Sequence, residues 1–187
     1  MNLKNLLPGK NFTLSEGLWL GFCATFIVLT KAVFRLHLHL TGHAMFFTMF
    51  FLLLGRGVVS KRGAATFIAL VAGILSMLLG MGKDGPLIIL KYVISGLVID
   101  IGFFLQPRIV ESYVGCALVA ALASTSRVIT LVLAEWLAGM DGKLIFQHAV
   151  IDSAMNMLFG VLGSLTVPPI IKRLKAGGLI HKESEGR

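Results

Sequence analysis

The chain has 187 residues, of which 56% are hydrophobic and 14% are charged, and its mean hydropathy is +0.87. Soluble domains average about 45–50% apolar and about 25% charged residues, so this composition excludes a soluble globular enzyme as well as a disordered chain. The net charge of +8 does not indicate a nucleic-acid partner, because the positive charges lie at the ends of apolar segments, as expected for a membrane protein.

Six apolar segments follow one another along the chain, separated by glycine, proline or charged residues. A helix needs roughly 20 apolar residues to cross the hydrocarbon core of a bilayer. The predicted membrane spans are residues 16–36, 43–59, 63–82, 85–105, 110–135 and 144–171. We therefore expect an all-α, polytopic membrane protein with a bundle of six transmembrane helices. Residues 1–15 form an N-terminal segment, residues 16–171 the transmembrane domain and residues 172–187 a charged tail.

The distribution of Lys and Arg predicts the orientation of this bundle. Eleven of the 17 Lys and Arg residues lie on the side of the two termini, and three lie on the opposite side. Cytoplasmic loops of membrane proteins carry an excess of positive residues. We therefore expect both termini, with the segments 1–15 and 172–187, to be cytoplasmic.

Polar side chains at membrane depth gather in the half of the predicted bundle that faces outward. In the last span, His148, Asp152 and Asn156 are spaced by four residues, which stacks them on one face of a helix. Lys91 and Arg127 lie at a similar depth in two other spans. Such charges usually face the bundle interior or a water-filled cavity, so we predict a polar, substrate-binding pocket. The alternative is that these charges only pair with one another and hold the helices together.

Two further residues near the outer interface, Tyr92 and Glu135, join the predicted substrate-binding set. Tyr92 can stack on a flat ligand or belong to an interfacial aromatic belt. Glu135 lies near a helix end, where it can also extend toward the interface, as can Lys31. Asp100 falls in the inner half, and we expect a structural role or a pairing with Lys or Arg near the inner surface.

Three histidines, His37, His39 and His43, form an H-x-H-x3-H cluster between the first two spans. We predict that this loop is a lid over the outer pocket. Imidazoles at this density can bind a transition metal, but no cysteine accompanies them and one short loop rarely supplies a closed site. We therefore expect no resident metal and no cofactor.

Small residues recur at four-residue spacing, which allows helices to approach closely. They include Ala65, Ala69 and Gly73 in the third span and Gly160 in the last one. In the first span, Gly17 and Gly21 form a G-x3-G motif that can face either another helix of the bundle or a partner subunit.

Several catalytic and energy-coupling motifs are absent from the sequence. There is no phosphate-binding loop of the G-x4-G-K-[ST] type, so the chain does not hydrolyse ATP by that route. There is no G-x-S-x-G nucleophile elbow and no H-E-x-x-H zinc motif. His148 and Asp152 leave open an acid/base pair in an intramembrane enzyme, and a structural or assembly subunit also remains open, but we do not expect an enzyme.

The stretch 55–65, GRGVVSKRGAA, resembles the cytoplasmic turn between the second and third helices of the substrate-binding S components of energy-coupling-factor (ECF) transporters. Ala72-Gly73, Leu78-Leu79-Gly80 and the segment from Gly85 to Gly102 are similar to that family as well. The similarity is greatest to its thiamine-precursor (hydroxymethylpyrimidine) branch, and it extends over roughly residues 14–171.

This resemblance implies a multi-pass protein of the prokaryotic cytoplasmic membrane. Its partners would be a small water-soluble nutrient (a vitamin or vitamin precursor), a T-type membrane coupling protein and cytoplasmic ATPases. It also implies a partner-contact surface on the first helix, where Gly17, Gly21 and Ala24 stand in place of the family's Ala-x3-Ala motif. The chain begins Met1-Asn2 and not Met-His, which argues against a nickel or cobalt subunit. The excess of Lys and Arg points to an anionic ligand and the family branch to a pyrimidine, and both possibilities stay open.

Overall fold

The computed structural model describes residues 13–37, 43–59, 61–81, 85–106 and 109–177 of the chain. These ranges consist of helices and turns without a strand, which confirms the predicted all-α fold. The elements in chain order are α1 (Leu14–His37), α2 (His43–Val58), α3 (Ala64–Leu78), α4 (Leu87–Leu105), the 3-10 helix η2 (Ile109–Glu111), α5 (Tyr113–Thr125), α6 (Arg127–Leu137), α7 (Gly142–Leu165) and α8 (Val167–Ala176).

The α-helices combine into six apolar segments, in agreement with the predicted spans. Four segments are long and apolar enough to cross a membrane: Leu14–Val33, Leu87–Leu105, Tyr113–Leu137 and Gly142–Ala176. The other two, α2 and α3, are shorter apolar helices of 16 and 15 residues. At 1.5 Å per residue they are about 24 Å and about 22 Å long.

Two of the predicted spans contain a break that the sequence analysis did not predict. The span 110–135 divides into α5 and α6 at Ser126, whose hydroxyl donates to the Ala123 carbonyl over 2.8 Å. The span 144–171 divides at Thr166, just before Pro168 and its neighbouring proline, which have no N–H to donate within a helix. The second half, α8, continues through residues 172–176, which were predicted to belong to the tail.

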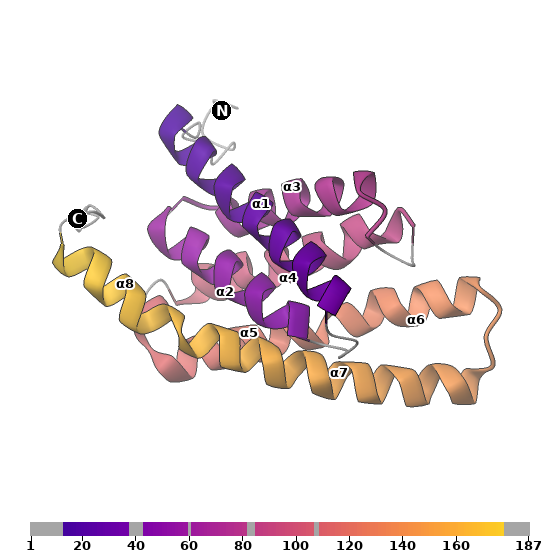
Figure 1. The fold of residues 1–187 in the computed structure, drawn as a ribbon. Coiled ribbons are helices and arrows are strands. Elements are labelled where there is room, and N and C mark those ends of the chain that lie inside the picture. Colours follow the sequence, from indigo (N-terminus) through magenta and orange to yellow (C-terminus); the bar gives the residue numbers. More distant parts are fainter. Residues whose placement is uncertain (1–12, 38–42, 60, 82–84, 107–108, 178–187) are drawn as a thin grey trace, which may run out of the picture.

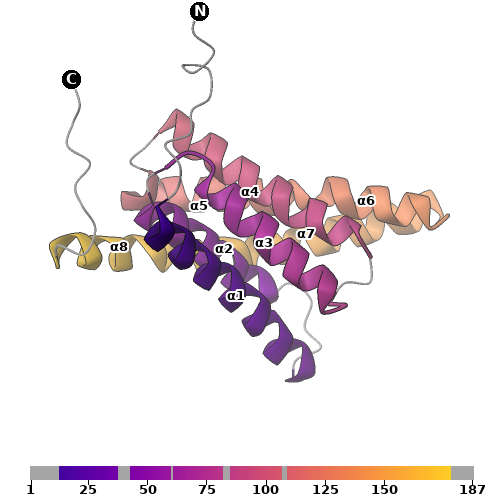
Figure 2. The same cartoon turned by 90° about the horizontal axis from the view of Figure 1, so that it is seen from above.

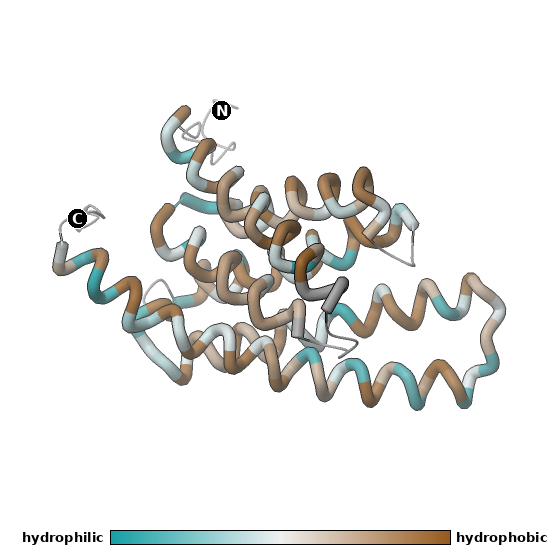
Figure 3. Tube along the Cα trace, viewed as in Figure 1, coloured by the Kyte–Doolittle hydropathy of each residue, from teal (hydrophilic) through white to brown (hydrophobic). Residues whose placement is uncertain are grey.

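The described chain begins and ends at the same end of the bundle. Figures 1 and 2 show the start of α1 and the end of α8 at this end, and the turn between α6 and α7 at the opposite end, where these two helices project beyond α1 to α4. Hydrophobic residues appear along most of the length of the helices in Figure 3. Many large apolar side chains are exposed, among them Leu18, Leu118 and Phe146, as expected for helices that face lipid.

Small residues bring α3 and α4 into close contact. A Cβ atom on Gly73 would lie 3.0 Å from the Cα atom of Ile89, and one on Gly96 would lie 2.7 Å from the Cβ atom of Ala69 and 2.9 Å from the carbonyl oxygen of Ala65. Both alanines are fully buried. The predicted stripe on the third span therefore packs inside the bundle.

Two glycines of α7 set its distance from α2 and α5. A Cβ atom on Gly163 would lie 2.2 Å from the carbonyl oxygen of Phe46 in α2, and one on Gly160 would lie 2.3 Å from the hydroxyl of Ser124 in α5. Because the first of these neighbours is backbone, it cannot move aside as a side chain can. These two positions fix α7 against the rest of the bundle.

A buried ion pair connects α2, α3 and α4. The Nε atom of Arg56, a residue that is only 7% exposed, lies 3.1 Å from a carboxylate oxygen of Asp100. The other oxygen of Asp100 accepts hydrogen bonds from the backbone N–H and the hydroxyl of Thr66, at 2.8 and 2.7 Å. Arg56 also donates to the carbonyl of Val59 over 3.1 Å and lies over the ring of Phe103. Asp100 thus has the structural role predicted for it.

We predict that Gly163→Ala destabilises the folded protein by about 1–3 kcal/mol, because the added methyl group overlaps backbone of α2. Gly21→Ala is the matched control, since a Cβ atom there meets nothing within 4 Å. Thermal unfolding of the purified protein in mild detergent measures both effects. Equal melting temperatures for the two variants would contradict this account of the packing between α2 and α7.

The variant Asp100→Ala removes the carboxylate and leaves the buried Arg56 charge without this partner. We expect the free energy of unfolding to fall by about 3–5 kcal/mol. Glu111→Ala is the control, because its pair with Lys175 is exposed and such pairs contribute about 0–1 kcal/mol. The double variant Arg56→Met, Asp100→Leu removes both charges and should recover part of the loss. A double variant less stable than Asp100→Ala would show that the ion pair is not what holds these helices.

Candidate functional site

A polar cavity of about 190 Å³ lies among α2, α4, α6 and α7. Its lining residues are Ala44, Met45, Lys91, Arg127, Leu131, Asp152 and Asn156. Four of them, two cations, one carboxylate and one amide, belong to the substrate-binding set predicted from the sequence. The structure therefore brings together residues that are up to 65 positions apart, from residue 91 to residue 156.

Each lining side chain is placed by a particular feature of its helix. Lys91 lies in the second turn of α4, close to the start of that helix at Leu87. Arg127 is the first residue of α6, directly after the break at Ser126. Asp152 and Asn156 lie one turn apart on α7, as their four-residue spacing predicts. The break between α5 and α6 is thus part of the geometry that positions Arg127.

Two cations lie against the same buried tyrosine beside the cavity. The ring of Tyr92, which is 1% exposed, has the ammonium of Lys31 at 5.3 Å and the guanidinium of Arg127 at 5.5 Å from its centroid. Both distances are within the range of a cation–π interaction. Arg127 also points its Nη1 atom at the sulfur of Met45, 2.6 Å away. Tyr92 therefore supports the cationic side of the cavity and does not line it.

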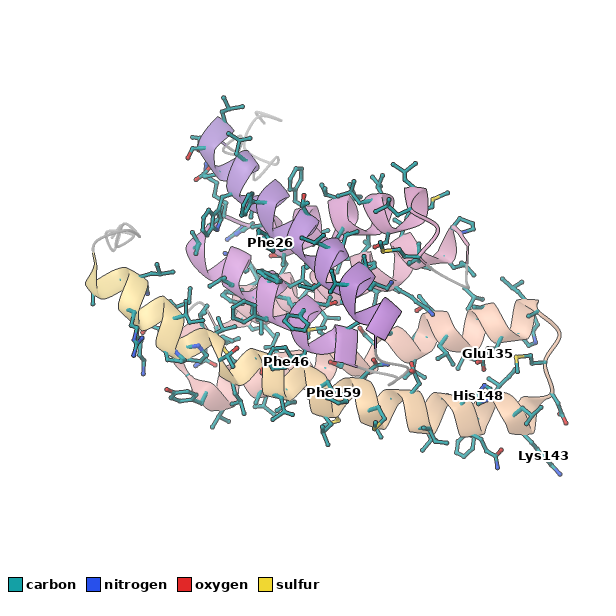
Figure 4. The ribbon with its side chains drawn as sticks, viewed as in Figure 1. Phe26, Phe46, Glu135, Lys143, His148 and Phe159 are labelled. Carbon is teal, nitrogen blue, oxygen red and sulfur yellow. The ribbon has the colours of Figure 1, made fainter. Side chains whose placement is uncertain are left out.

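The predicted stack of polar residues on α7 separates into two pairs. The amide of Asn156 donates to a carboxylate oxygen of Asp152 over 2.7 Å. The Nδ1 atom of His148 lies 3.2 Å from a carboxylate oxygen of Glu135 in α6. Figure 4 shows these two side chains facing one another across the α6–α7 hairpin, with Lys143 near its tip. His148 and Glu135 do not line the polar cavity, so their predicted part in substrate binding is a proposal without geometric support.

A second cavity, of about 800 Å³, is a mainly apolar groove at the other end of the bundle. It lies between the first turns of α1, the end of α2 at Val58 and Val59, and Leu174 of α8. On the wall formed by α1, Glu16 pairs with Lys61 from the connection between α2 and α3. The groove has the character of a surface for an apolar partner or for lipid rather than of a site for a polar small molecule.

The predicted partner-contact surface on α1 is only partly accessible. Positions 17 and 21 are open, because a Cβ atom on Gly17 or Gly21 would meet nothing within 4 Å. Ala24 is fully buried among the other helices. The prediction for Ala24 is corrected for this reason: it lies on nearly the same face of α1 as Gly17, but two turns farther along the helix, where this face is fully buried.

The predicted lid histidines lie outside the part of the chain whose side chains the structure describes. Position 37 ends α1 and position 43 begins α2, and His39 falls between the two described ranges. Among the described residues, no group of three or more His, Cys, Asp or Glu side chains is arranged to hold a metal ion.

Sequence reasoning missed two contributors to the site. Met45 was predicted to be a packing residue, and Lys31 was interpreted as a side chain that can extend to the interface. Met45 contacts Arg127, and Lys31 contacts the ring of Tyr92, so both lie on the cationic side of the cavity. The depth of Lys31 within its span was the available signal, but depth does not reveal which helix a side chain faces.

Residues 17–131 match the model of a protein family described as ABC-type cobalt transport system, permease component. The chain belongs to this family. A solved structure described as "Crystal structure of an S-component of ECF transporter" shares the fold of this permease component, with a TM-score of 0.64 and 17% sequence identity over 90% of this chain and 88% of that chain. No curated protein matches the chain.

These two similarities establish a multi-pass membrane transport subunit with the S-component fold. They confirm the resemblance to S components predicted from residues 55–65, and they agree with the prediction of a transport subunit rather than an enzyme. The thiamine-related branch stays a prediction. At 17% identity the structural similarity shows the fold alone. It does not carry binding residues of the solved structure over to the polar cavity of this permease component.

We predict that Tyr92→Leu destabilises this permease component more than Tyr92→Phe does. The leucine variant removes the ring that two cations contact, whereas phenylalanine keeps the ring for both. The expected difference is about 1–2 kcal/mol, measured by thermal unfolding in detergent. If the two variants are equally unstable, the tyrosine hydroxyl and not the ring face carries the interaction.

Proposed function

We propose that this permease component is the substrate-binding subunit of an ECF-type ABC importer. It would capture a small water-soluble nutrient, a vitamin or vitamin precursor, and deliver it for ATP-driven uptake. The observation that carries the proposal is the cavity lined by Lys91, Arg127, Asp152 and Asn156 within an S-component fold. Charged side chains around a cavity at membrane depth are typical of a substrate pathway.

The distribution of positive charge supports an outward-facing cavity. Lys61 and Arg62 follow α2, and α8 carries Lys172, Arg173 and Lys175. These residues lie at the end of the bundle where the described chain begins and ends, away from the cavity. By the positive-inside rule we infer that this end is cytoplasmic. The cavity would then lie in the outer half of a prokaryotic cytoplasmic membrane.

Uptake against a gradient requires an energy source, and the partners we propose are a T-type transmembrane coupling protein and cytoplasmic ATPases. The open face of α1 at Gly17 and Gly21, together with the neighbouring apolar groove at Trp19 and Phe22, offers a contact surface at the cytoplasmic end. Close approach of another helix needs small residues of this kind. Ala24 is excluded from this surface by its burial.

The geometry does not favour the alternative functions. An acid/base pair of His148 and Asp152 would need these side chains to act together, but His148 contacts Glu135 and Asp152 contacts Asn156. A purely structural role for the charges suits the Arg56–Asp100 pair. It suits Asp152 less well: Arg127 does contact Met45 and Tyr92 on other helices, but the Asp152–Asn156 contact lies within α7 and joins no helices.

We expect the tagged full-length protein, solubilised in mild detergent from its own host, to recover a second membrane protein together with one or two ATPases, which protein mass spectrometry would identify. A membrane that lacks this permease component is the control for unspecific capture. Recovery of the chain alone would contradict the importer assignment.

We expect Asp152→Ala and Arg127→Ala each to lower the amount of small molecule that remains bound to the purified protein by at least tenfold. The physical reason is that each variant removes a charged group that lines the cavity. Extraction and mass spectrometry measure the bound compound per mole of folded protein. Lys143→Gln, an exposed charge at the tip of α7, is the control that should retain it. Wild-type occupancy in both cavity variants would remove the cavity from consideration as the binding site.

A further inference from the structure

We infer that the substrate of the polar cavity is a small molecule that carries an anionic group, a carboxylate or a phosphate, and not a free divalent metal ion. This inference rests on the proposed function and specifies its substrate class.

The charges around the cavity are unequal. Lys91 and Arg127 line it, and the ammonium of Lys31 lies against Tyr92, the same ring that Arg127 contacts. Asp152 is the one carboxylate among the lining residues of the cavity. Even with Lys91 left out of the count, Lys31 and Arg127 outnumber the one lining carboxylate, so the described surroundings of the cavity carry an excess of positive charge.

The contacts of Arg127 and Lys31 do not neutralise these two cations. Arg127 contacts the sulfur of Met45 and the ring of Tyr92, and Lys31 contacts that ring. All of these contacted groups are neutral. A charge at membrane depth without an opposite charge is costly, so an anion that enters the cavity gains the attraction that the protein itself does not supply. The planar guanidinium of Arg127 can hold a carboxylate or phosphate through two parallel hydrogen bonds.

Asp152 and Asn156 on α7 form another part of the cavity wall, which would contact a different part of the substrate. Asp152 accepts from Asn156 through one carboxylate oxygen, and its second oxygen can accept from an N–H or O–H group. The volume of about 190 Å³ is below the roughly 300–1,000 Å³ of typical ligand pockets. The cavity thus fits a compound of about one ring, with an acid at one end and a hydrogen-bond donor at the other.

The same residues oppose a bare Co²⁺ ion, although the family description mentions cobalt. Transition-metal sites in proteins use imidazole, thiolate or carboxylate ligands. The cavity provides one carboxylate, one amide and one thioether, and it places Lys91 and Arg127 beside them, where they repel a divalent cation. The donor set therefore favours an anion over the metal.

The test measures thermal unfolding of the purified full chain in detergent with matched probes at up to 20 mM. The pairs are nicotinate and nicotinamide, benzoate and benzamide, and glycerol phosphate and glycerol, with inorganic phosphate and CoCl₂ alone as further probes. We expect at least one anion to raise the melting temperature while its neutral counterpart does not. The carboxylate and phosphate pairs show which acid the cavity prefers. Arg127→Gln should weaken this effect at least tenfold, and Lys143→Gln should leave it unchanged.

Three results would overturn the inference: stabilisation by a neutral probe or by Co²⁺ that equals that of the anions, no stabilisation by any anion, or an anion effect that persists in Arg127→Gln. The charge of the compound extracted from the native protein is an independent readout, and a neutral or cationic compound would also overturn it. A neutral ligand that is lost in Asp152→Ala would leave the proposed function standing, whereas failure to recover partner subunits would oppose the function itself.

Discussion

The bilayer interior requires every buried charge to find a partner, and the ion pair between Arg56 and Asp100 shows how this chain meets that requirement. The pair lies where α2 ends, α3 begins and α4 passes. Asp100 supplies the start of α3 with the acceptor that Gly63 lacks, since it receives the N–H and the hydroxyl of Thr66. Arg56 returns a hydrogen bond to the carbonyl of Val59 at the end of α2. A negative charge at a helix start and a positive charge at a helix end are both favourable for the helix dipole. This interaction therefore satisfies backbone groups at two helix ends and connects three helices.

The other end of the bundle is organised in the opposite way. There Lys31 and Arg127 contact the ring of Tyr92, Arg127 also contacts the thioether of Met45, and the carboxylate of Asp152 contacts an amide on its own helix. Close packing by Gly160 and Gly163 holds α7 in place, so Asp152 and Asn156 remain near the cavity without an ion pair to another helix. One end of the bundle thus contains a buried ion pair between helices, and the other contains cations on neutral groups beside the polar cavity.

Much of this arrangement follows from the sequence, because apolar length and charge depth are local properties. The spans, the structural role of Asp100 and four cavity residues were predicted in this way. The pairing of side chains between helices was not, because it depends on how each helix rotates about its axis. Four-residue spacing placed His148 with Asp152, yet Glu135 on α6 pairs with His148. Ala24 shares a helix face with Gly17 and Gly21, yet farther along α1 that face is buried. The break at Ser126 could not be predicted from hydropathy, because α5 and α6 together form one continuous apolar stretch that is long enough to cross the membrane.

The short length of α2 explains why a cavity forms at this place. Its 16 residues extend about 24 Å, less than the roughly 30 Å of hydrocarbon. Ala44 and Met45, in its first turn, line the cavity, so the space lies where α2 begins while α4, α6 and α7 continue beside it. The start of a helix carries a partial positive charge, which adds to the potential of Lys91 and Arg127. A fold can host different functions. Under the proposed function, helix lengths would create the space, and the side chains at its border would determine which charge it accepts.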